Sequence, residues 1–214
     1  MRQLVLDLLA PRVPGFDNFL AGANGEALAS VRALAEGRLA ESVVYLWGEA
    51  GCGRSHLLNA ASASVLDAAA SSKLVVADDV ERLDDAAQVA LFNRINEARE
   101  GGPSVLAAGN APPSQLALRE DLRSRLGWGL VYQLQPLTDA DKADYLHAES
   151  ARRGLALGDG VIGYLLTRAR RDMAFLEALV AHLDRHALEH QRRVTIPLVR
   201  DALGSLDHDP PRPV

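Results

Sequence analysis

The sequence predicts an α/β fold, in which a mainly parallel sheet lies between layers of helices and a smaller all-helical domain follows. Three observations lead to this prediction. Short apolar runs alternate with helical stretches as far as about residue 135, a pattern typical of parallel strands joined by crossover helices. A glycine-rich loop connects the first clear strand to the next helix. Beyond Pro136 the strand signals give way to helical ones.

The strands are expected from apolar runs that are bounded by polar residues, glycine or proline. These runs cover residues 43–47, 74–77, 104–109 and 130–134. The run 74–77 is apolar throughout and therefore indicates a buried parallel strand. Between the strands, helices are expected over 28–39, over 55–70, from Asp84 onward and over 116–126. In the third of these helices, Val89, Phe92, Ile95 and Asn96 have the spacing of one inner face.

The second domain begins where Thr138 and Asp141 have the spacing of a helix capping box. Further helices are expected over 160–170, over 173–190 and from Thr195, with 193–196 as the one weak strand signal. The predicted organisation is an extended N-terminal segment (1–13), the α/β domain (14–135), the helical domain (136–207) and a disordered tail (208–214).

The composition is that of an ordinary globular protein, with 48% hydrophobic and 24% charged residues. The net charge of -5 gives no strong attraction to nucleic acid. No apolar stretch is long enough for a membrane span, and the N-terminus lacks the apolar core of a signal peptide. A single cysteine, Cys52, excludes an internal disulfide, so we expect a cytoplasmic protein.

The most informative motif joins the first strand to its helix. Gly48, Gly51, Cys52, Gly53, Arg54 and Ser55 follow the pattern of a phosphate-binding loop, except that arginine replaces the usual lysine. Glycines allow successive backbone amides to turn toward one anion, and the helix N-terminus adds its dipole. We expect a bound nucleotide, with Ser55 as a magnesium ligand and Cys52 as a small filler. The alternative is a glycine turn.

Polar residues also end the next two strands. Asp78 stands where a magnesium-ordering carboxylate is needed, and Asp79 could orient a water molecule. Asn110 could contact the terminal phosphate or the attacking water. The alternatives are a strand end with two solvated aspartates, and an Asn-Ala-Pro-Pro turn.

Three arginines in two segments are further candidates. Arg123 and Arg125 are two positions apart on a predicted helix, so only one of them can point at a given target. Arg171 begins a helix of the second domain and could contact phosphates bound between the domains. Surface salt bridges are the alternative for each arginine.

Taken together, these motifs resemble the AAA+ ATPases, and more narrowly the DnaA branch with its Hda family. Residues 14–19 are similar to the entry box of DnaA-like proteins, and residues 45–58 to the Hda form of the P-loop, which also carries arginine. Residues 123–130 resemble the box that holds the arginine finger, with Arg125 at the finger position. Residues 171–173 resemble the sensor-2 motif, and the likeness spans about 14–203.

The resemblance implies an AAA+ P-loop sheet sandwiched by helices and followed by an all-α lid. It implies a nucleotide, ADP or ATP, with a possible Mg²⁺ at Ser55 and Asp78. The expected nucleotide-binding residues are the P-loop residues Gly48, Gly51, Cys52, Gly53, Arg54 and Ser55 together with His56, Asp78, Asn110 and Arg171. Only about twenty residues separate Ser55 from Asp78, so this sheet is expected to be one strand narrower than in DnaA.

The N-terminus resembles the short peptide with which Hda docks on the sliding clamp, the β subunit of DNA polymerase III. The peptide would use Gln3, Leu4, Leu6 and Leu8, with Asp7 where proline is often found. A frayed strand is the alternative. The chain stops after the lid, so no DNA-binding domain follows and no direct specific DNA binding is expected.

The implied function is negative regulation of replication initiation. Held on the clamp, the protein would stimulate ATP hydrolysis by DnaA through Arg125 and would itself be an activator rather than an enzyme. A homo-oligomeric assembly is also expected. The alternative is an active AAA+ ATPase, such as a relative of helicase loaders or clamp loaders; Asp78 and Asp79 favour it, and Arg54 opposes it. A P-loop small-molecule kinase fits poorly, because no acceptor motif is visible.

Overall fold

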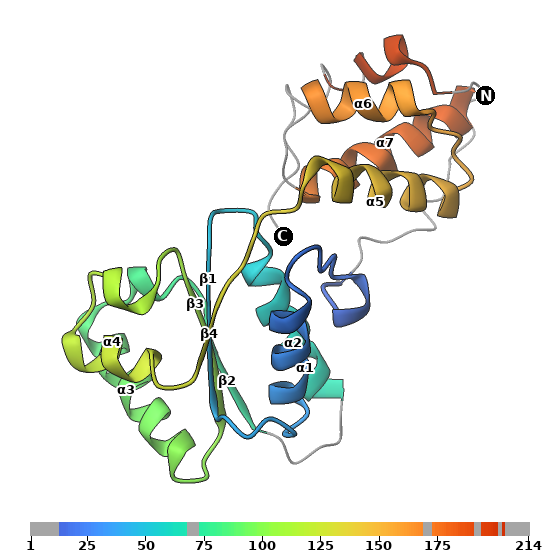
Figure 1. The fold of residues 1–214 in the computed structure, drawn as a ribbon. Coiled ribbons are helices and arrows are strands. Elements are labelled where there is room, and N and C mark those ends of the chain that lie inside the picture. The colour runs from blue at the N-terminus through green and yellow to red at the C-terminus, as the bar shows by residue number, and fades with distance from the viewer. Residues whose placement is uncertain (1–12, 68–72, 169–172, 191–193, 201–202, 204–214) are drawn as a thin grey trace. The chain divides into compact units, whose positions relative to one another are not determined.

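The structure is a computed structural model that describes residues 13–67, 73–168, 173–190, 194–200 and 203. These residues fall into two units, which divide between Pro136 and Leu137. The first is an α/β unit and the second is helical (Figure 1). The expected N-terminal peptide, Arg171 and the C-terminal tail lie outside the described residues.

The α/β unit is built on a parallel sheet of four strands in the order β2-β3-β1-β4. The strands are β1 (Val43–Trp47), β2 (Leu74–Ala77), β3 (Ser104–Gly109) and β4 (Leu130–Gln133). The central strand β1 pairs with β3 and β4, and its last residue, Trp47, lies opposite Gly109 and Gln133. The predicted parallel sheet is therefore confirmed, with each strand start within one residue of its predicted position.

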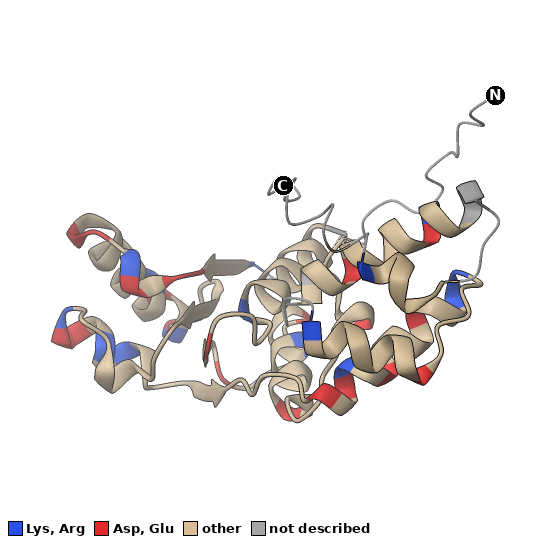
Figure 2. Cartoon of the chain, turned by 90° about the horizontal axis from the view of Figure 1, so that it is seen from above, with Lys and Arg blue, Asp and Glu red and all other residues tan. Residues whose placement is uncertain are grey.

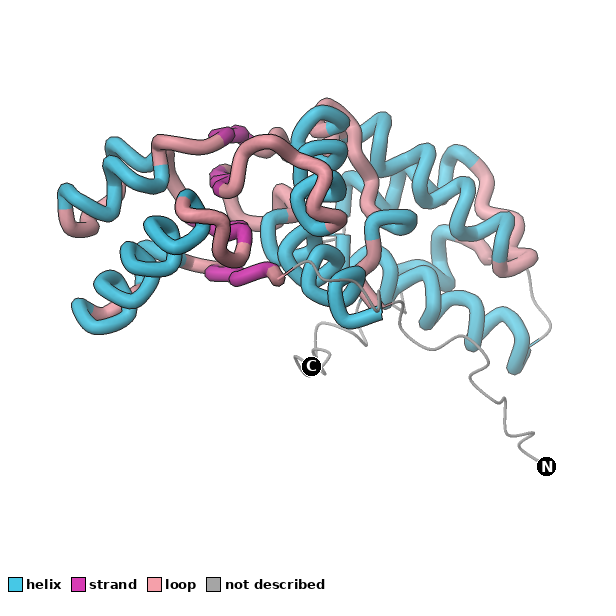
Figure 3. Tube along the Cα trace, turned by 90° about the horizontal axis from the view of Figure 1, so that it is seen from below, coloured by secondary structure: helices cyan, strands magenta, loops and turns pink. Residues whose placement is uncertain are grey.

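Helices cover both faces of this sheet (Figures 1 and 3). The helices α1 (Gly25–Ala35) and α2 (Arg54–Asp67) pack with Val44 and Leu46 of β1 in one core. The helices α3 (Asp85–Arg99) and α4 (Glu120–Leu126) pack with Val43 and Tyr45 in a second core on the opposite face. The alternation follows from the two-residue side-chain period of a strand. This three-layer arrangement is the predicted α/β sandwich.

Two helices differ in extent from the prediction. The helix expected over 28–39 begins three residues earlier and ends at Ala35, because Gly37 adopts a left-handed conformation (φ +68°). The helix expected over 116–126 is shorter, since only Glu120–Leu126 is α-helical. Residues Pro113–Gln115 form a 3-10 turn instead, and Leu116 is extended and buried in the second core.

The inner face of α3 also differs from the prediction. Asp84 caps the helix as expected, because its carboxylate accepts a hydrogen bond from the Ala87 amide at 2.8 Å. Val89, however, is exposed, and the buried residues are Gln88, Leu91, Ile95 and Ala98. Ile95 was predicted correctly, but the first turns of the face were assigned one position too far along the chain. Gln88 is buried there, and its side chain is hydrogen-bonded to the backbone of Leu83 and Arg119.

The strand β2 is not buried as the sequence suggested. It lies at the edge of the sheet and pairs only with β3 among the described strands, so all four of its residues are half-buried. The expectation of a narrow sheet agrees with the four strands found in the described part of the chain.

The helical unit contains α5 (Asp139–Arg152), α6 (Asp159–Arg168) and α7 (Met173–His190) around one apolar core. The predicted capping box is present at α5: the Thr138 hydroxyl accepts a hydrogen bond from the Asp141 amide at 3.1 Å. Residues 196–200 are helical, with Pro197 in the first turn, where a missing amide is tolerated. Val194 and Thr195 form no strand, so the weak strand signal was wrong.

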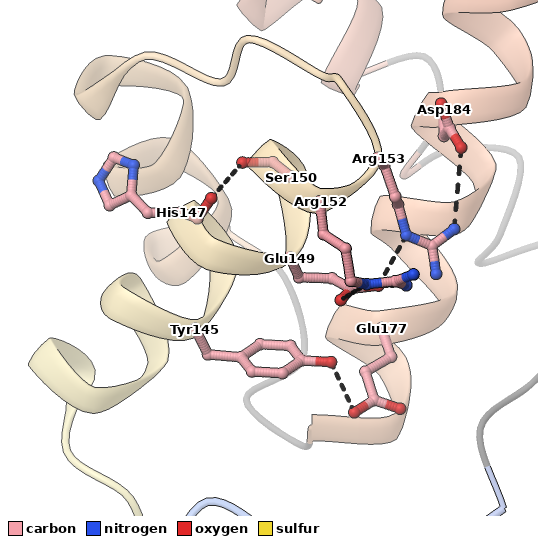
Figure 4. Close-up of polar contacts among 8 residues, drawn as sticks. All are labelled: Tyr145, His147, Glu149, Ser150, Arg152, Arg153, Glu177 and Asp184. Carbon is pink, nitrogen blue, oxygen red and sulfur yellow. Dashed lines mark hydrogen bonds and ion pairs between the residues drawn. The ribbon is translucent and has the colours of Figure 1, made fainter. Parts of the chain in front are cut away.

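An ion-pair network joins α5 to α7 within this unit (Figure 4). The Glu149 carboxylate accepts hydrogen bonds from the Nε atoms of Arg152 (2.8 Å) and Arg153 (2.7 Å), and Arg153 also lies 3.8 Å from Asp184. These contacts lower the pKa of the Glu149 carboxyl to about 2, chiefly through the Arg152 hydrogen bond and against the opposing effect of burial.

Elsewhere the charged side chains show no single dominant sign. Residues of both signs, Lys and Arg as well as Asp and Glu, occur on the helices of both units (Figure 2). None of the helices in the described ranges combines the length and the apolar character that a bilayer crossing requires.

Candidate functional site

The sheet topology places a switch point at the carboxyl end of β1. The neighbouring strands β1 and β3 lead into helices on opposite faces, because α2 packs in the first core and α4 in the second. In open α/β sheets, ligands bind at the carboxyl edge where adjacent strands diverge in this way. The glycine-rich loop and Asn110 flank this switch point, since Trp47 and Gly109 are direct neighbours in the sheet.

The glycine-rich loop fills the six residues between Trp47 and the start of α2 at Arg54. Gly51 and Gly53 adopt positive φ angles of +82° and +101°, which ordinary side chains rarely tolerate. The loop closes through a hydrogen bond from the Cys52 amide to the Glu49 carbonyl (3.2 Å). It therefore delivers the chain to the N-terminus of a 14-residue helix, whose first amides have no partner within the helix.

Two of the glycines are also required by close packing. A side chain at Gly48 would place its Cβ 2.6 Å from the Leu134 carbonyl oxygen. A side chain at Gly53 would lie 2.7 Å from the ring of Phe19. The loop thus sits tightly between the end of β4 and the segment that precedes α1.

The one cysteine of the chain lies inside this loop. Cys52 is buried in the first core, and burial raises the pKa of its thiol. A thiol that stays protonated is a poor nucleophile, so Cys52 acts as a packing residue.

Arg54 and Ser55 occupy the first turn of α2. Ser55 is exposed, whereas one terminal nitrogen of Arg54 is buried without a hydrogen-bond partner. A buried guanidinium nitrogen without a partner is costly unless an acceptor binds there. Together with the turned amides of the loop, this donor set fits the phosphates of a nucleotide.

His56, predicted to bind nucleotide, contacts the segment before α1. Its Nε2 lies 3.1 Å from the Gly15 carbonyl and 3.0 Å from the Asn18 side-chain oxygen, and its ring packs against Phe19. Asn18 in turn accepts a hydrogen bond from the Gly15 amide at 2.9 Å. His56 therefore fastens this entry segment, which includes the 3-10 turn Phe16–Asn18, onto the helix of the P-loop.

The two aspartates after β2 are not equivalent. Asp78 is exposed, and its carboxylate accepts a hydrogen bond from the Asp79 amide at 2.9 Å. Asp79 has a left-handed conformation (φ +45°) and pairs with Arg82 at 3.3 Å. These carboxylates follow β2, and the strand β3 lies between β2 and β1, which leads into the P-loop.

A third carboxylate, Glu81, is brought to the carboxyl end of β3 by the 3-10 turn Val80–Arg82. Its oxygen lies 3.3 Å from the Asn110 amide, beside Gly109 at the end of β3. Sequence reasoning missed Glu81, because nothing in its neighbourhood distinguishes it from a solvated glutamate. The buried Tyr45 lies beneath this group; its pKa is raised by burial and by Glu81, and its hydroxyl donates to the Ala111 carbonyl at 2.8 Å.

Arg125 lies near the amino ends of the parallel strands, whereas the P-loop lies at their carboxyl ends. It is in the last turn of α4, five residues before the first residue of β4, and Leu130 pairs with Val44 near the beginning of β1. The P-loop follows the other end of β1. A five-residue strand rises by roughly 3.3 Å per residue, so most of the strand length separates the two sites.

The Arg125 guanidinium is half-buried and rests on aromatic rings. Its Cζ lies 3.3 Å from the centroid of the Trp128 ring and 5.3 Å from that of Phe92. It makes no hydrogen bond or ion pair with another described residue, and of its nitrogens only Nε is buried without a partner. Arg123, on another face of α4, approaches the Ser114 carbonyl at 3.5 Å.

The described residues contain no cluster of three or more His, Cys, Asp or Glu side chains suited to a metal ion. The expected magnesium ligands Ser55 and Asp78 follow β1 and β2 respectively, on either side of the end of β3.

Family models match both units of the chain. The model described as the bacterial DnaA ATPase domain matches residues 11–77, and the model described as the Hda lid domain matches residues 139–203. The chain is a Hda/DnaA-like AAA+ protein. The Hda/DnaA-like resemblance and the helical lid predicted from the sequence are thereby confirmed.

Solved structures of AAA+ proteins have the same fold. Domain III of the replication initiation protein DnaA from Thermotoga maritima aligns with a TM-score of 0.75 at 17% identity, over 92% of this chain and 98% of that one. AMPPCP-bound DnaA from Aquifex aeolicus aligns with a TM-score of 0.67 at 19% identity, over 81% of this chain and 65% of that one.

The likeness extends beyond DnaA. The Thermotoga maritima RuvB R170A variant aligns with a TM-score of 0.67 at 16% identity, over 92% of this chain and 74% of that one. At these identities the alignments establish the AAA+ fold alone. The function of this Hda/DnaA-like chain must therefore be inferred from its own residues.

Proposed function

We propose that this Hda/DnaA-like protein is a nucleotide-bound regulator that, docked on the sliding clamp, stimulates ATP hydrolysis by DnaA through Arg125. By converting DnaA to its ADP form, it suppresses a second round of replication initiation. The proposal depends on one observation: Arg125 lies near the amino ends of the parallel strands, while the P-loop lies at their carboxyl ends. An arginine there is suited to a neighbour's nucleotide rather than its own.

The nucleotide, ADP or ATP, binds at the P-loop. The positive φ angles of Gly51 and Gly53 and the unpartnered nitrogen of Arg54 support this part of the proposal. Ser55 and Asp78 are the residues that would hold a Mg²⁺ ion, which when bound neutralises phosphate charge. Asn110, at the end of β3, would contact the terminal phosphate, and Arg171 of the lid would add a further phosphate contact.

Arg125 acts on the nucleotide of the partner. Its planar guanidinium matches phosphate oxygens through paired donors, and no carboxylate of the described residues pairs with it. An arginine supplied in this way accelerates phosphoryl transfer by about 10³- to 10⁵-fold. This is the role in which the protein activates another ATPase.

The remaining partners follow from the N-terminal peptide. Gln3, Leu4, Leu6 and Leu8 would fill an apolar groove of the clamp β subunit, and the clamp would bring the protein to DnaA on DNA. The resemblance of both units to DnaA-type proteins supports assembly through the same AAA+ surfaces, including homo-oligomers. The protein itself would make no specific DNA contact.

An active AAA+ ATPase is the second candidate, and Glu81 is the observation that favours it. This carboxylate lies at the carboxyl edge of the sheet next to Asn110, where an attacking water would need a base. The arginine in place of the P-loop lysine opposes it, because a guanidinium does not replace the compact ammonium between terminal phosphates. Intrinsic ATP turnover near background would support the regulator, and turnover lost in Glu81→Gln would support the ATPase.

Two binding measurements test the parts separately. Arg54→Ala is expected to weaken ADP binding at least about tenfold, because a charge-assisted contact is lost; calorimetry with ADP measures it. Deletion of residues 1–8 is expected to abolish clamp binding while ADP binding remains. Retained clamp affinity in the deletion would remove the docking assignment.

A further inference from the structure

Two arginines and one tryptophan form a stack at the amino edge of the sheet. The Cζ of Arg99, the last residue of α3, lies 4.0 Å from the Trp128 ring centroid, and that of Arg125 lies 3.3 Å from it. Two planar guanidinium groups so close to one centroid cannot share a face of the ring. The indole therefore lies between them.

The backbone around Trp128 is fixed independently of this stack. Its amide donates to the Arg125 carbonyl at 3.1 Å, which continues the last turn of α4. The following Gly129 packs on the start of β1, where a Cβ would lie 2.7 Å from the Val43 carbonyl carbon. The indole is thus held on a rigid part of the fold, although 42% of its surface is exposed.

The stack is the main restraint on Arg125. The guanidinium has no hydrogen bond or ion pair with a described residue, and its second aromatic contact, Phe92, is more distant at 5.3 Å. A long arginine side chain without such a restraint would sample many rotamers. Cation–π stacking on tryptophan is the strongest of the aromatic contacts available to a guanidinium.

We propose that Trp128, backed by Arg99, is a positioning residue that holds the Arg125 guanidinium ready for the nucleotide of a partner. This inference rests on the proposed function and adds residues to it. The indole limits the rotamers of Arg125 without neutralising its charge, so the terminal nitrogens keep their donors for phosphate oxygens. Arg99 fixes the other face of the indole and adds positive charge to the same edge.

The test uses full-length variants and two readouts. Trp128→Leu removes the aromatic face, and Trp128→Phe keeps one. In assays of DnaA-ATP hydrolysis with clamp and DNA, Trp128→Leu is expected to lower the maximal stimulated rate by about 10- to 100-fold, since misplacing a catalytic group by about 1 Å has an effect of that size. The half-saturating concentration is expected to change by less than about threefold, because docking on the clamp is untouched.

Trp128→Phe is expected to retain the rate within about threefold, because it keeps an aromatic face. This result would show that the effect of Trp128→Leu comes from lost stacking and not from local unfolding. Arg99→Gln is expected to lower the rate by a smaller factor than Trp128→Leu. An undiminished maximal rate in Trp128→Leu, or a change confined to the half-saturating concentration, would overturn the positioning role.

Indole fluorescence reports on the stack of Arg99, Trp128 and Arg125 in the protein alone, without DnaA or the clamp. In a Trp47→Phe background, Trp128 is the remaining tryptophan, and Arg125→Ala is expected to change its emission intensity and maximum because one stacked cation is lost. Unchanged emission would overturn the stack in solution. If Arg125→Ala leaves stimulation intact, the proposed function fails; if it abolishes stimulation while Trp128→Leu does not, only the positioning inference fails.

Discussion

Replacing Glu149 by glutamine tests how the helical unit is held together. The Glu149 side chain is 4% exposed and accepts hydrogen bonds from Arg152 and Arg153, which also brings Asp184 of α7 into the network. Glutamine keeps the volume but removes the charge that pairs with both guanidinium groups. The substitution therefore leaves the largely buried Arg153 and the partly exposed Arg152 with a weaker partner.

The magnitude follows from the pKa of the carboxyl group. Its fall from 4.5 to about 2 on folding corresponds, at about 1.4 kcal/mol per unit, to about 3 kcal/mol of folding free energy at neutral pH. Because the folded pKa lies below the unfolded one, this stabilisation is present above the unfolded value. It is lost as the pH falls from 4.5 through about 2.

Urea unfolding followed by far-UV circular dichroism measures the difference between the native protein and Glu149→Gln. We expect the helical unit of the variant to be less stable by about 3 kcal/mol at pH 7, and the difference to shrink toward zero near pH 2. Glu177→Gln is the matched control, since this exposed side chain accepts one hydrogen bond, from Tyr145, and is expected to cost less than about 1 kcal/mol. A difference that stays constant from pH 7 to pH 2 would show that the charge of Glu149 does not stabilise the helical unit.

Three further substitutions test close packing, side-chain hydrogen bonds and helix propensity. Gly48→Ala is expected to lower stability by about 1–3 kcal/mol, because its Cβ would meet the Leu134 carbonyl at 2.6 Å; Gly25→Ala, with open space, is the control in urea unfolding. Asn24→Ala is expected to cost about 1–3 kcal/mol, since it removes hydrogen bonds of 2.9 and 2.7 Å to the Gln135 backbone, and an unchanged midpoint would contradict this. Gly163→Ala, exposed within α6, is expected to raise the melting temperature through a gain of about 0.5–1 kcal/mol; a decrease would count against the helix.

The fold could be predicted from the sequence where burial controls the pattern. Strands β1 and β3 are central and packed on both faces, so their apolar runs have the same bounds in the sequence and in the structure. Prediction was poorer where tertiary contacts override local pattern. Gln88 is buried and bonded to the distant Arg119 amide, and Leu116 is buried without being helical. The inner face of α3 was therefore predicted only in part, through Ile95, and the start of α4 was misplaced.

The candidate site divides in a similar way. The P-loop could be predicted because glycine positions with positive φ or close packing leave a sequence signature. The role of His56 in fastening the entry segment could not, because Gly15 and Asn18 meet it only in the folded chain. Glu81 and Trp128 were missed for the same reason: their neighbours, Asn110 and Arg99, come from other elements.

The arginine-finger role of Arg125 is tested most directly by the rate of DnaA-ATP hydrolysis with clamp and DNA. The rate is measured with the native protein, Arg125→Ala and Arg123→Ala. Arg123 is the matched control, since it lies two residues away on the same helix and approaches the Ser114 carbonyl instead of an aromatic stack. We expect Arg125→Ala to lose the stimulation, about 10³-fold or more, while Arg123→Ala keeps it and both variants still bind the clamp. Stimulation by Arg125→Ala equal to that of the native protein would exclude Arg125 as the arginine finger.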